Sequence, residues 1–352
     1  MGEWKNNLRS VEPYVPGEQP NFEDMIKLNT NENPYPPAPA VEEILRSLSA
    51  DKLRLYPKPD AKELVEALAA EYNVKPEQVF VGVGSDDVLG MAFLTCFSGK
   101  KKILFPDITY SFYPVWADLF QIPYECPALD ENFRVRTADY LKENGGIVIA
   151  NPNAPTSIAL PLSEIETIVA GNPDSVVIVD EAYVDFGAQS ALPLVEKYEN
   201  LLVVQTFSKS RSMAGMRIGF AIGQKELIDA IYAVRNSYNS YTMNYPSILC
   251  GAAAVADRAY FDKTRHAIME TREAVTEKLQ KLGFFVLPSA TNFLFASHDR
   301  VDAEVIFEKL REKHIYVRYF KQPRIRDFLR ITIGTPEQMD RFLQEVEAIV
   351  VE

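Results

Sequence analysis

The sequence predicts an α/β protein in which a mainly parallel seven-stranded sheet, with helices on both faces, is joined to a small α+β domain. Short, continuous apolar runs rich in β-branched residues alternate with helical patterns through the first 250 residues. Such runs are typical of parallel strands that are buried on both faces. After residue 250 the alternation gives way to longer helices and clustered strands, and 352 residues are enough for about two domains.

Residues 1–40 are expected to form an extended arm rather than a domain. The stretch 33–39 reads Asn-Pro-Tyr-Pro-Pro-Ala-Pro. Each proline removes a backbone donor, and the residue before a proline avoids the helical conformation. Two helices are expected after the arm, at about 40–48 and 61–72, because apolar residues recur there at helical spacing.

A large domain is expected over residues 41–250, and a small one over 251–352. The expected strands of the large domain lie at 78–83, 102–105, 146–150, 176–180 and 201–206. A sixth run at 217–222 follows Thr206 too closely for a full crossover, which favours an antiparallel strand. The expected elements of the small domain are a long helix at 251–281, strands at 283–287, 292–296 and 329–333, and helices at 302–313 and 336–350.

Composition excludes several classes of protein. Apolar residues make up 47% of the chain and charged residues 24%, which excludes a disordered or fibrous protein. The net charge of −12 gives no general attraction for nucleic acid or anionic lipid, so a bound anion needs a local cluster of positive groups. No stretch approaches 18 apolar residues and no leader pattern stands at the start. We therefore expect a soluble, cytoplasmic protein with neither nucleic-acid nor membrane partners.

The cysteines and histidines predict neither disulfides nor a metal site. Cys96, Cys126 and Cys250 lie far apart and lack CxxC partners, which is typical of free thiols in a reducing compartment. None of the three histidines lies within metal-ligand spacing of another.

Polar residues follow five of the expected strands, where an open parallel sheet binds its ligands. Each segment by itself has an ordinary explanation, such as a helix cap or a surface lysine. Together they suit a phosphate: Ser85 and Asp86 open a helix whose free N–H groups bind anions. Ser208 and Arg217 add a hydroxyl and a guanidinium.

The remaining strand-end residues suit an aromatic nitrogen ring that carries an aldehyde. Tyr110 offers a flat face, and Asp180 offers a carboxylate for a protonated ring nitrogen. Tyr183 offers a hydroxyl for a ring oxygen, and Lys209 offers an amine that can form an imine. Phosphate, ring and aldehyde together describe pyridoxal 5′-phosphate (PLP). The absence of GxGxxG and GxxxxGK[ST] weakens nicotinamide and nucleotide alternatives.

The chain resembles the aspartate-aminotransferase fold family from about Tyr14 to its C-terminus. The resemblance is carried by Asn31-Glu32-Asn33-Pro34, Leu55-Tyr56-Pro57, Asp180-Glu181-Ala182-Tyr183, Thr206-Phe207-Ser208-Lys209 with Ala214-Gly215-Met216-Arg217-Ile218-Gly219, and Leu329-Arg330-Ile331-Thr332-Ile333-Gly334-Thr335. Within the family, the chain most resembles the members that act on histidinol phosphate. This implies PLP-dependent transamination between histidinol phosphate and glutamate or 2-oxoglutarate, a step of histidine biosynthesis.

The resemblance also implies a role for each matching residue. Lys209 would hold the cofactor covalently and move the proton, while Asp180 pairs with the ring nitrogen and Tyr183 with the ring hydroxyl. The other residues implied to bind the cofactor are Tyr110 on the ring, and Ser85, Asp86, Ser208, Arg217 and the partner's Tyr56 on the phosphate, in a homodimer with shared sites. The residues implied to face the substrate are Tyr14, Asn33, Arg318 and Arg330.

One departure from the family pattern concerns the ring hydroxyl. The family usually has Asn before Pro-Thr-Gly, whereas this chain reads Asn153-Ala154-Pro155-Thr156-Ser157. Either Asn153 shifts to bond the ring hydroxyl, which is the preferred expectation, or Tyr183 bonds it alone.

Three alternatives stay open at the level of the sequence. The first is another aminotransferase specificity, aromatic amino acids above all. The second is a lyase on the same scaffold, such as a threonine-phosphate decarboxylase, which would release CO2 instead of a keto product. The third is a ligand-sensing domain without catalysis.

Overall fold

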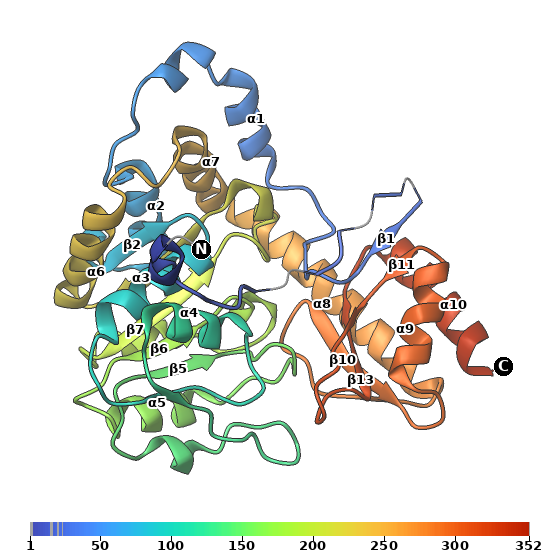
Figure 1. Cartoon of the computed structure of the whole chain (residues 1–352). Coiled ribbons are helices and arrows are strands. Elements are labelled where there is room, and N and C mark those ends of the chain that lie inside the picture. The colour runs from blue at the N-terminus through green and yellow to red at the C-terminus, as the bar shows by residue number, and fades with distance from the viewer. Residues whose placement is uncertain (1–2, 15–16, 20, 23, 352) are drawn as a thin grey trace.

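The computed structural model describes residues 3–14, 17–19, 21–22 and 24–351, and it shows two unequal parts (Figure 1). The larger part is built on a seven-stranded sheet in the order β2-β8-β7-β6-β5-β3-β4. Its strands are β2 (Val79–Gly82), β3 (Ile103–Leu104), β4 (Tyr124–Glu125), β5 (Ile147–Ala150), β6 (Val177–Asp180), β7 (Leu201–Thr206) and β8 (Gly219–Gly223). Strand β8 runs antiparallel to β2 and β7, and the other neighbours are parallel. The predicted fold class and the antiparallel sixth run are thus confirmed.

Helices cover both faces of this sheet because the side chains of its strands alternate between two cores. In β6, Val177 and Val179 pack in one hydrophobic cluster and Ile178 in the other. The first cluster includes residues of α1 (Pro39–Ser47), α2 (Lys62–Tyr72), α5 (Leu162–Ala170) and α7 (Tyr245–Ala256). The second includes residues of α3 (Ser85–Cys96), α4 (Phe112–Phe120) and α6 (Lys225–Tyr238). Short 3-10 turns are η1 (Glu3–Asn7), η2 (Ala50–Arg54), η3 (Pro76–Gln78), η4 (Thr137–Tyr140), η5 (Val184–Phe186), η6 (Leu192–Leu194) and η7 (Ala214–Met216).

The smaller part has an antiparallel sheet in the order β12-β13-β10-β9 with helices packed against it. Its elements are α8 (Arg258–Lys281), β9 (Phe284–Val286), β10 (Phe293–His298), α9 (Ala303–Glu312), β11 (Ile315–Tyr316), β12 (Arg318–Tyr319), β13 (Phe328–Thr332) and α10 (Pro336–Val351). Strand β1 (Ile26–Lys27) pairs in parallel with β11, and Ile26 and Leu28 are buried in the core of this part. One segment of the expected arm is therefore structurally part of the small domain.

The expected single helix over 251–281 is wrong, because two helices meet at Asp257. The Asp257 carboxylate accepts a hydrogen bond of 3.2 Å from the Tyr260 backbone N–H and so caps the start of α8. Ala254 of α7 packs in the core of the large sheet, whereas Ile268 of α8 packs in the core of the small sheet. Helix α8 carries the chain from one part to the other (Figure 1). The exact domain limits stay a prediction.

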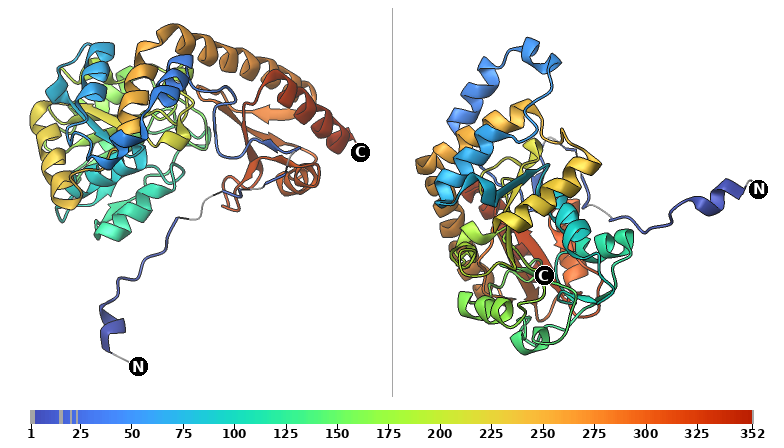
Figure 2. Two further views of the ribbon diagram at one scale, coloured as in Figure 1. Left: turned by 90° about the horizontal axis from the view of Figure 1, so that it is seen from above. Right: turned by 90° about the vertical axis from the view of Figure 1, so that its left-hand side faces the viewer.

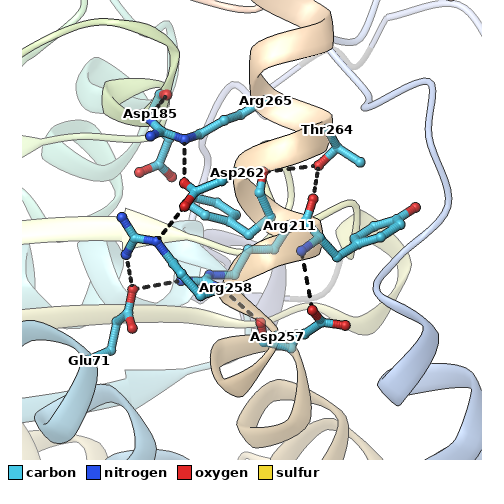
Figure 3. Close-up of polar contacts among 11 residues, drawn as sticks. Glu71, Asp185, Arg211, Asp257, Arg258, Asp262, Thr264 and Arg265 are labelled. Atoms are coloured by element: carbon cyan, nitrogen blue, oxygen red, sulfur yellow. Dashed lines mark hydrogen bonds and ion pairs between the residues drawn. The ribbon is translucent and has the colours of Figure 1, made fainter.

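A network of charged side chains surrounds the start of α8 (Figure 3). Arg211, which is only 7% exposed, lies 4.4 Å from the centre of the Phe261 ring. Its guanidinium is 3.9 Å from the carboxylate of Glu71, and the same carboxylate also pairs with Arg258. Arg258 in turn pairs with Asp262 at 3.1 Å. The loop after β7 is thereby fastened to the junction of α7 and α8.

The first described residues extend away from the body of the molecule (Figure 2). No helix in the described part of the chain is long and apolar enough to cross a membrane.

Candidate active site

A cavity of about 180 Å³ lies at the carboxyl ends of β5, β6 and β7. Parallel strands direct the residues that follow them to this edge of the sheet. The structure brings eight predicted cofactor residues together on its wall: Ser85, Asp86, Tyr110, Asp180, Tyr183, Ser208, Lys209 and Arg217. Residues far apart in the sequence therefore share one site.

Asp180 places a carboxylate in the cavity at the end of β6. It is 5% exposed, and it accepts hydrogen bonds from the Tyr113 hydroxyl at 2.8 Å and from the Ala182 backbone N–H at 3.2 Å. Burial outweighs these bonds and raises the pKa of Asp180 to about 6. Within the described residues, no cationic side chain pairs with this carboxylate. A protonated ring nitrogen would supply the missing positive charge.

The start of α3 forms an anion cradle together with Arg217. Gly84 precedes the helix with φ +86°, and a Cβ there would lie 2.5 Å from Arg217 Nη2. A Cβ on Gly219 would lie 2.3 Å from the Ser85 backbone nitrogen. The absence of a side chain at Gly84 thus lets the Arg217 guanidinium approach the start of the helix. The absence of one at Gly219 lets β8 approach the free N–H groups there. With the Ser208 hydroxyl on the same wall, these donors suit a phosphate.

Tyr110 and Asp86 hold each other at the rim of this cradle. The Tyr110 hydroxyl donates to Asp86 Oδ1 at 2.8 Å, and Asp86 Oδ2 lies 3.3 Å from Arg217 Nη2. Burial and the Asp86 charge raise the pKa of Tyr110 well above its ordinary value. Tyr110 therefore stays neutral, and its ring is fixed on the cavity wall.

Lys209 is positioned by the segment around Asn33. Its Nζ donates to the carbonyl oxygen of Thr30 at 3.0 Å and lies 5.8 Å from the centre of the Tyr183 ring. Asn33 Nδ2 donates to the backbone oxygens of Lys209 at 2.9 Å and Ser210 at 3.3 Å. Asn33, predicted to face the substrate, thus uses its side-chain amide to hold the lysine loop.

The structure does not bring Asn153 to the cavity, contrary to the preferred expectation. Its Oδ1 accepts from Thr109 at 2.8 Å, and its Nδ2 donates to Ile108 O and Thr156 Oγ1, both at 2.9 Å. Both donors of the buried amide are engaged, so none is left for a ring oxygen. Ala154, which carries no side-chain donor, lines the cavity instead.

Asn31 is a site residue that sequence reasoning missed. Its side-chain Nδ2 donates to the Tyr183 hydroxyl oxygen at 2.9 Å, although the residue itself is 1% exposed and lies behind the cavity. The sequence does contain a sign of its importance, because Asn31 begins the segment Asn31-Glu32-Asn33-Pro34, which resembles the family. Its partner was out of reach of sequence reasoning, because 152 positions separate the two residues.

Two arginines of the small sheet form a second positive centre. Arg318 of β12 and Arg330 of β13 are direct cross-strand partners. Arg330 Nη2 donates to Asn29 O at 2.8 Å, and its buried Nε has no hydrogen-bond partner among the described residues. Burial, with Arg318 nearby, lowers the pKa of Arg330. No carboxylate of the described chain forms an ion pair with either arginine.

The arginine pair lies beside the cofactor cavity. The Arg330 guanidinium lies 5.4 Å from the centre of the Phe293 ring, and the Tyr183 ring of the cavity wall lies 5.1 Å from the same ring. The Tyr14 ring stacks on Phe112 with 4.3 Å between ring centres. Phe112 in turn lies 5.6 Å from the Tyr110 ring of the cavity wall, so Tyr14 and Arg330 are each separated from that wall by one aromatic ring.

Tyr56 is far more exposed than the rest of the predicted site. It is 82% exposed, its ring lies 4.7 Å from that of Tyr241, and it does not line the cavity of its own chain.

Fold and site together define a PLP-dependent enzyme: the unpaired buried Asp180, the anion cradle and the strand-end Lys209 each match one part of that cofactor. The chain belongs to the class I and II aminotransferase family, whose model matches residues 23–346. It is a PLP-dependent aminotransferase.

Relatives with this fold are similar over nearly the whole chain. The chain is 52% identical to the histidinol-phosphate aminotransferase of Acinetobacter baumannii (strain SDF) over 347 residues, which cover 98% of this chain and 96% of that protein. It is 52% identical to the histidinol-phosphate aminotransferase of Lactococcus lactis subsp. cremoris (strain SK11), over 97% of this chain and 96% of the relative. The fold matches the crystal structure of the histidinol-phosphate aminotransferase of Sinorhizobium meliloti in complex with pyridoxal-5′-phosphate, with a TM-score of 0.84, 23% identity and coverage of 92% and 90% of the two chains.

Proposed function

We propose that this enzyme transfers the amino group of histidinol phosphate to 2-oxoglutarate, giving glutamate, in histidine biosynthesis. The observation that carries the proposal is the pair Arg318 and Arg330, two guanidinium groups without a carboxylate partner in the described chain. Arg330 is separated from Tyr183 on the wall of the PLP cavity by the Phe293 ring alone. Guanidinium groups bind phosphate in a bidentate manner. The two relatives that are 52% identical are named histidinol-phosphate aminotransferases.

The residues of the cavity divide the chemical work. When bound, PLP accepts the electron pair that remains when the α-proton of an amino donor is removed. Lys209 Nζ takes that proton and returns it, because it is the amine on the cavity wall at the end of β7. The ionised Asp180 keeps a proton on the ring nitrogen. Thr30 O gives Lys209 Nζ a hydrogen-bond acceptor at 3.0 Å whenever this amine is free.

The arginines orient the substrate through its anionic end. Arg330 is fixed by its bond to Asn29 O, and its Nε is left to donate to a ligand. Arg318 is half-buried, and its guanidinium lies 5.6 Å from the centre of the Phe320 ring.

The substitution Arg318→Leu tests the substrate. A hydrogen bond to a charged group is worth about 1.5–3 kcal/mol, so kcat/KM for histidinol phosphate should fall about 10- to 100-fold. The loss for phenylalanine, which has no phosphate, should be much smaller. Arg326→Leu, at an exposed arginine of the same region, serves as control and should change neither value. Equal losses for both donors would contradict the proposal and favour an aromatic aminotransferase.

We further propose that the working unit is a C2 homodimer in which the partner's Tyr56 completes the phosphate site. The exposed fractions are 47–82% for four apolar side chains at the end of η2, just after it and on the turn that carries Tyr241: Leu53, Leu55, Tyr56 and Tyr241. The rings of Tyr56 and Tyr241 lie 4.7 Å apart. Exposed apolar side chains that gather in this way are typical of a subunit interface.

We also propose the cytoplasm as its location, because Cys96, Cys126 and Cys250 are all free thiols, which suits a reducing compartment.

A further inference from the structure

The hydrogen bonds around Asn31 fix the direction of each proton in a short chain. The backbone N–H of Asn31 donates to Thr332 Oγ1 at 3.0 Å, so this hydroxyl oxygen acts there as an acceptor. The single proton of the Thr332 hydroxyl then donates to Asn31 Oδ1 at 3.0 Å. Because Oδ1 is engaged with Thr332, the amide nitrogen Nδ2 faces Tyr183.

The phenol of Tyr183 is therefore an acceptor toward Asn31. An amide nitrogen can only donate, so the Tyr183 oxygen accepts at 2.9 Å and its own proton points elsewhere. The described residues offer this proton no acceptor, and Tyr183 lines the cofactor cavity. The asparagine that the family usually has before Pro-Thr-Gly supplies no donor here, because Ala154 takes its place on the wall and both donors of the preceding Asn153 are engaged elsewhere.

We propose that Asn31 is a positioning residue that holds the Tyr183 oxygen as an acceptor and thereby directs the phenol proton at the ring oxygen of PLP. Asn31 touches neither the cavity nor the reacting atoms and acts through Tyr183. The inference depends on the role at the ring oxygen that the resemblance to the family implies for Tyr183, but not on the identity of the amino donor.

The same contacts make this orientation dependent on the small domain. Thr332 ends β13, and Asn292, just before β10, donates through Nδ2 to the backbone oxygen of Asn31 at 3.0 Å. Asn31 itself has φ +56°, a conformation that asparagine and glycine tolerate better than other residues. Four polar atoms of the buried Asn31 are thus hydrogen-bonded: three to Thr332 and Asn292 of the small domain, and one to the Tyr183 hydroxyl.

A double-mutant cycle on the PLP-loaded enzyme tests the inference. Two quantities are measured for wild type, Asn31→Gly, Tyr183→Phe and the double variant. The first is the midpoint, which is the pH at which half of the change in the visible absorption of the bound cofactor has occurred. The second is the affinity for PLP. Glycine keeps the left-handed backbone and removes only the amide. The ring oxygen carries more negative charge in the high-pH form, so loss of its donor should raise the midpoint. Tyr183→Phe should raise the midpoint by about one to two pH units, which is the value of a hydrogen bond to a charged oxygen.

The expected result is a rise with Asn31→Gly that disappears in the Tyr183→Phe background, since the amide acts only through the phenol. Asn73→Gly is the matched control, because Asn73 has φ +52° but lies at the exposed end of α2, and it should leave the midpoint unchanged. The inference would be overturned if Asn31→Gly left the midpoint unchanged, or if Asn31→Gly raised it equally with and without the Tyr183 hydroxyl. Either result would leave the role of Tyr183 itself intact. An unchanged midpoint in Tyr183→Phe would overturn the proposed role of Tyr183 and the inference with it. Neither result would bear on the substrate.

Discussion

Replacing Asp180 by Asn should stabilise the PLP-free protein at neutral pH while it weakens PLP binding. The Asp180 carboxylate is buried without a cation, and burial raises its pKa from 3.8 to about 6. A carboxylic acid with a raised native pKa stabilises the fold below its unfolded pKa, and this contribution is lost as the pH rises through the native pKa. The shift of about 2 pKa units corresponds to about 3 kcal/mol, at 1.36 kcal/mol per unit.

The measurement is urea unfolding of PLP-free wild type and Asp180→Asn between pH 4.5 and pH 8. The free energy of unfolding of the variant, relative to wild type, should rise by about 2 kcal/mol over this range, because part of the loss already occurs below pH 4.5. Burial also raises the pKa of the neighbouring Glu181, to about 7, but that group is common to both proteins and cancels in the difference. Asp174→Asn, at an exposed aspartate, should show no such rise. In the presence of PLP, wild type should have the higher free energy of unfolding, because the variant lacks the negative charge that is expected to hold the ring nitrogen. Parallel pH curves for wild type and Asp180→Asn would refute the reasoning.

Three further predictions follow from the site and its surroundings. Lys209→Ala should still bind PLP through the phosphate cradle but lose turnover by several orders of magnitude; retention of a tenth of the activity after dialysis would contradict its role. Mixing Lys209→Ala with Tyr56→Ala subunits should restore about one quarter of wild-type activity. Half of the dimers are then mixed, and one of the two sites in each mixed dimer has both Lys209 and the partner's Tyr56. No gain in activity over the separate variants would exclude shared sites. Arg211→Met should lower the free energy of unfolding by about 3 kcal/mol in a urea titration, since a buried charge network is broken, whereas the exposed Arg54→Met should stay within about 0.5 kcal/mol; equal effects would show that the Arg211 network is dispensable.

Much of the fold could be predicted because it depends on local patterns. The continuous apolar runs of β5, β6 and β7 are the strand signature of a sheet covered on both faces, and the structure places them there. The two-residue strand β4 is too short to give a pattern. The break between α7 and α8 was missed because a capping aspartate inside a helical pattern is a weak signal without its partner Tyr260.

The cofactor cavity was predictable for a similar reason. Its residues follow strands, and topology brings strand ends together without any knowledge of side-chain contacts. The roles of Asn33, Asn153 and Asn31 could not be predicted in this way. Each depends on which hydrogen-bond partner a side-chain amide reaches in space, and these partners lie 3 to 301 positions away in the sequence.

We propose that the substrate is the phosphate ester of an amino alcohol, and the specificity constants of the wild-type enzyme test this most directly. We expect kcat/KM for histidinol phosphate, with 2-oxoglutarate as acceptor, to exceed that for tyrosine and phenylalanine by about 100-fold or more. Of these donors, only histidinol phosphate carries a phosphate for the proposed site at Arg318 and Arg330. The product should be the keto compound, without release of CO2. Equal or greater kcat/KM for the aromatic amino acids would contradict the claim.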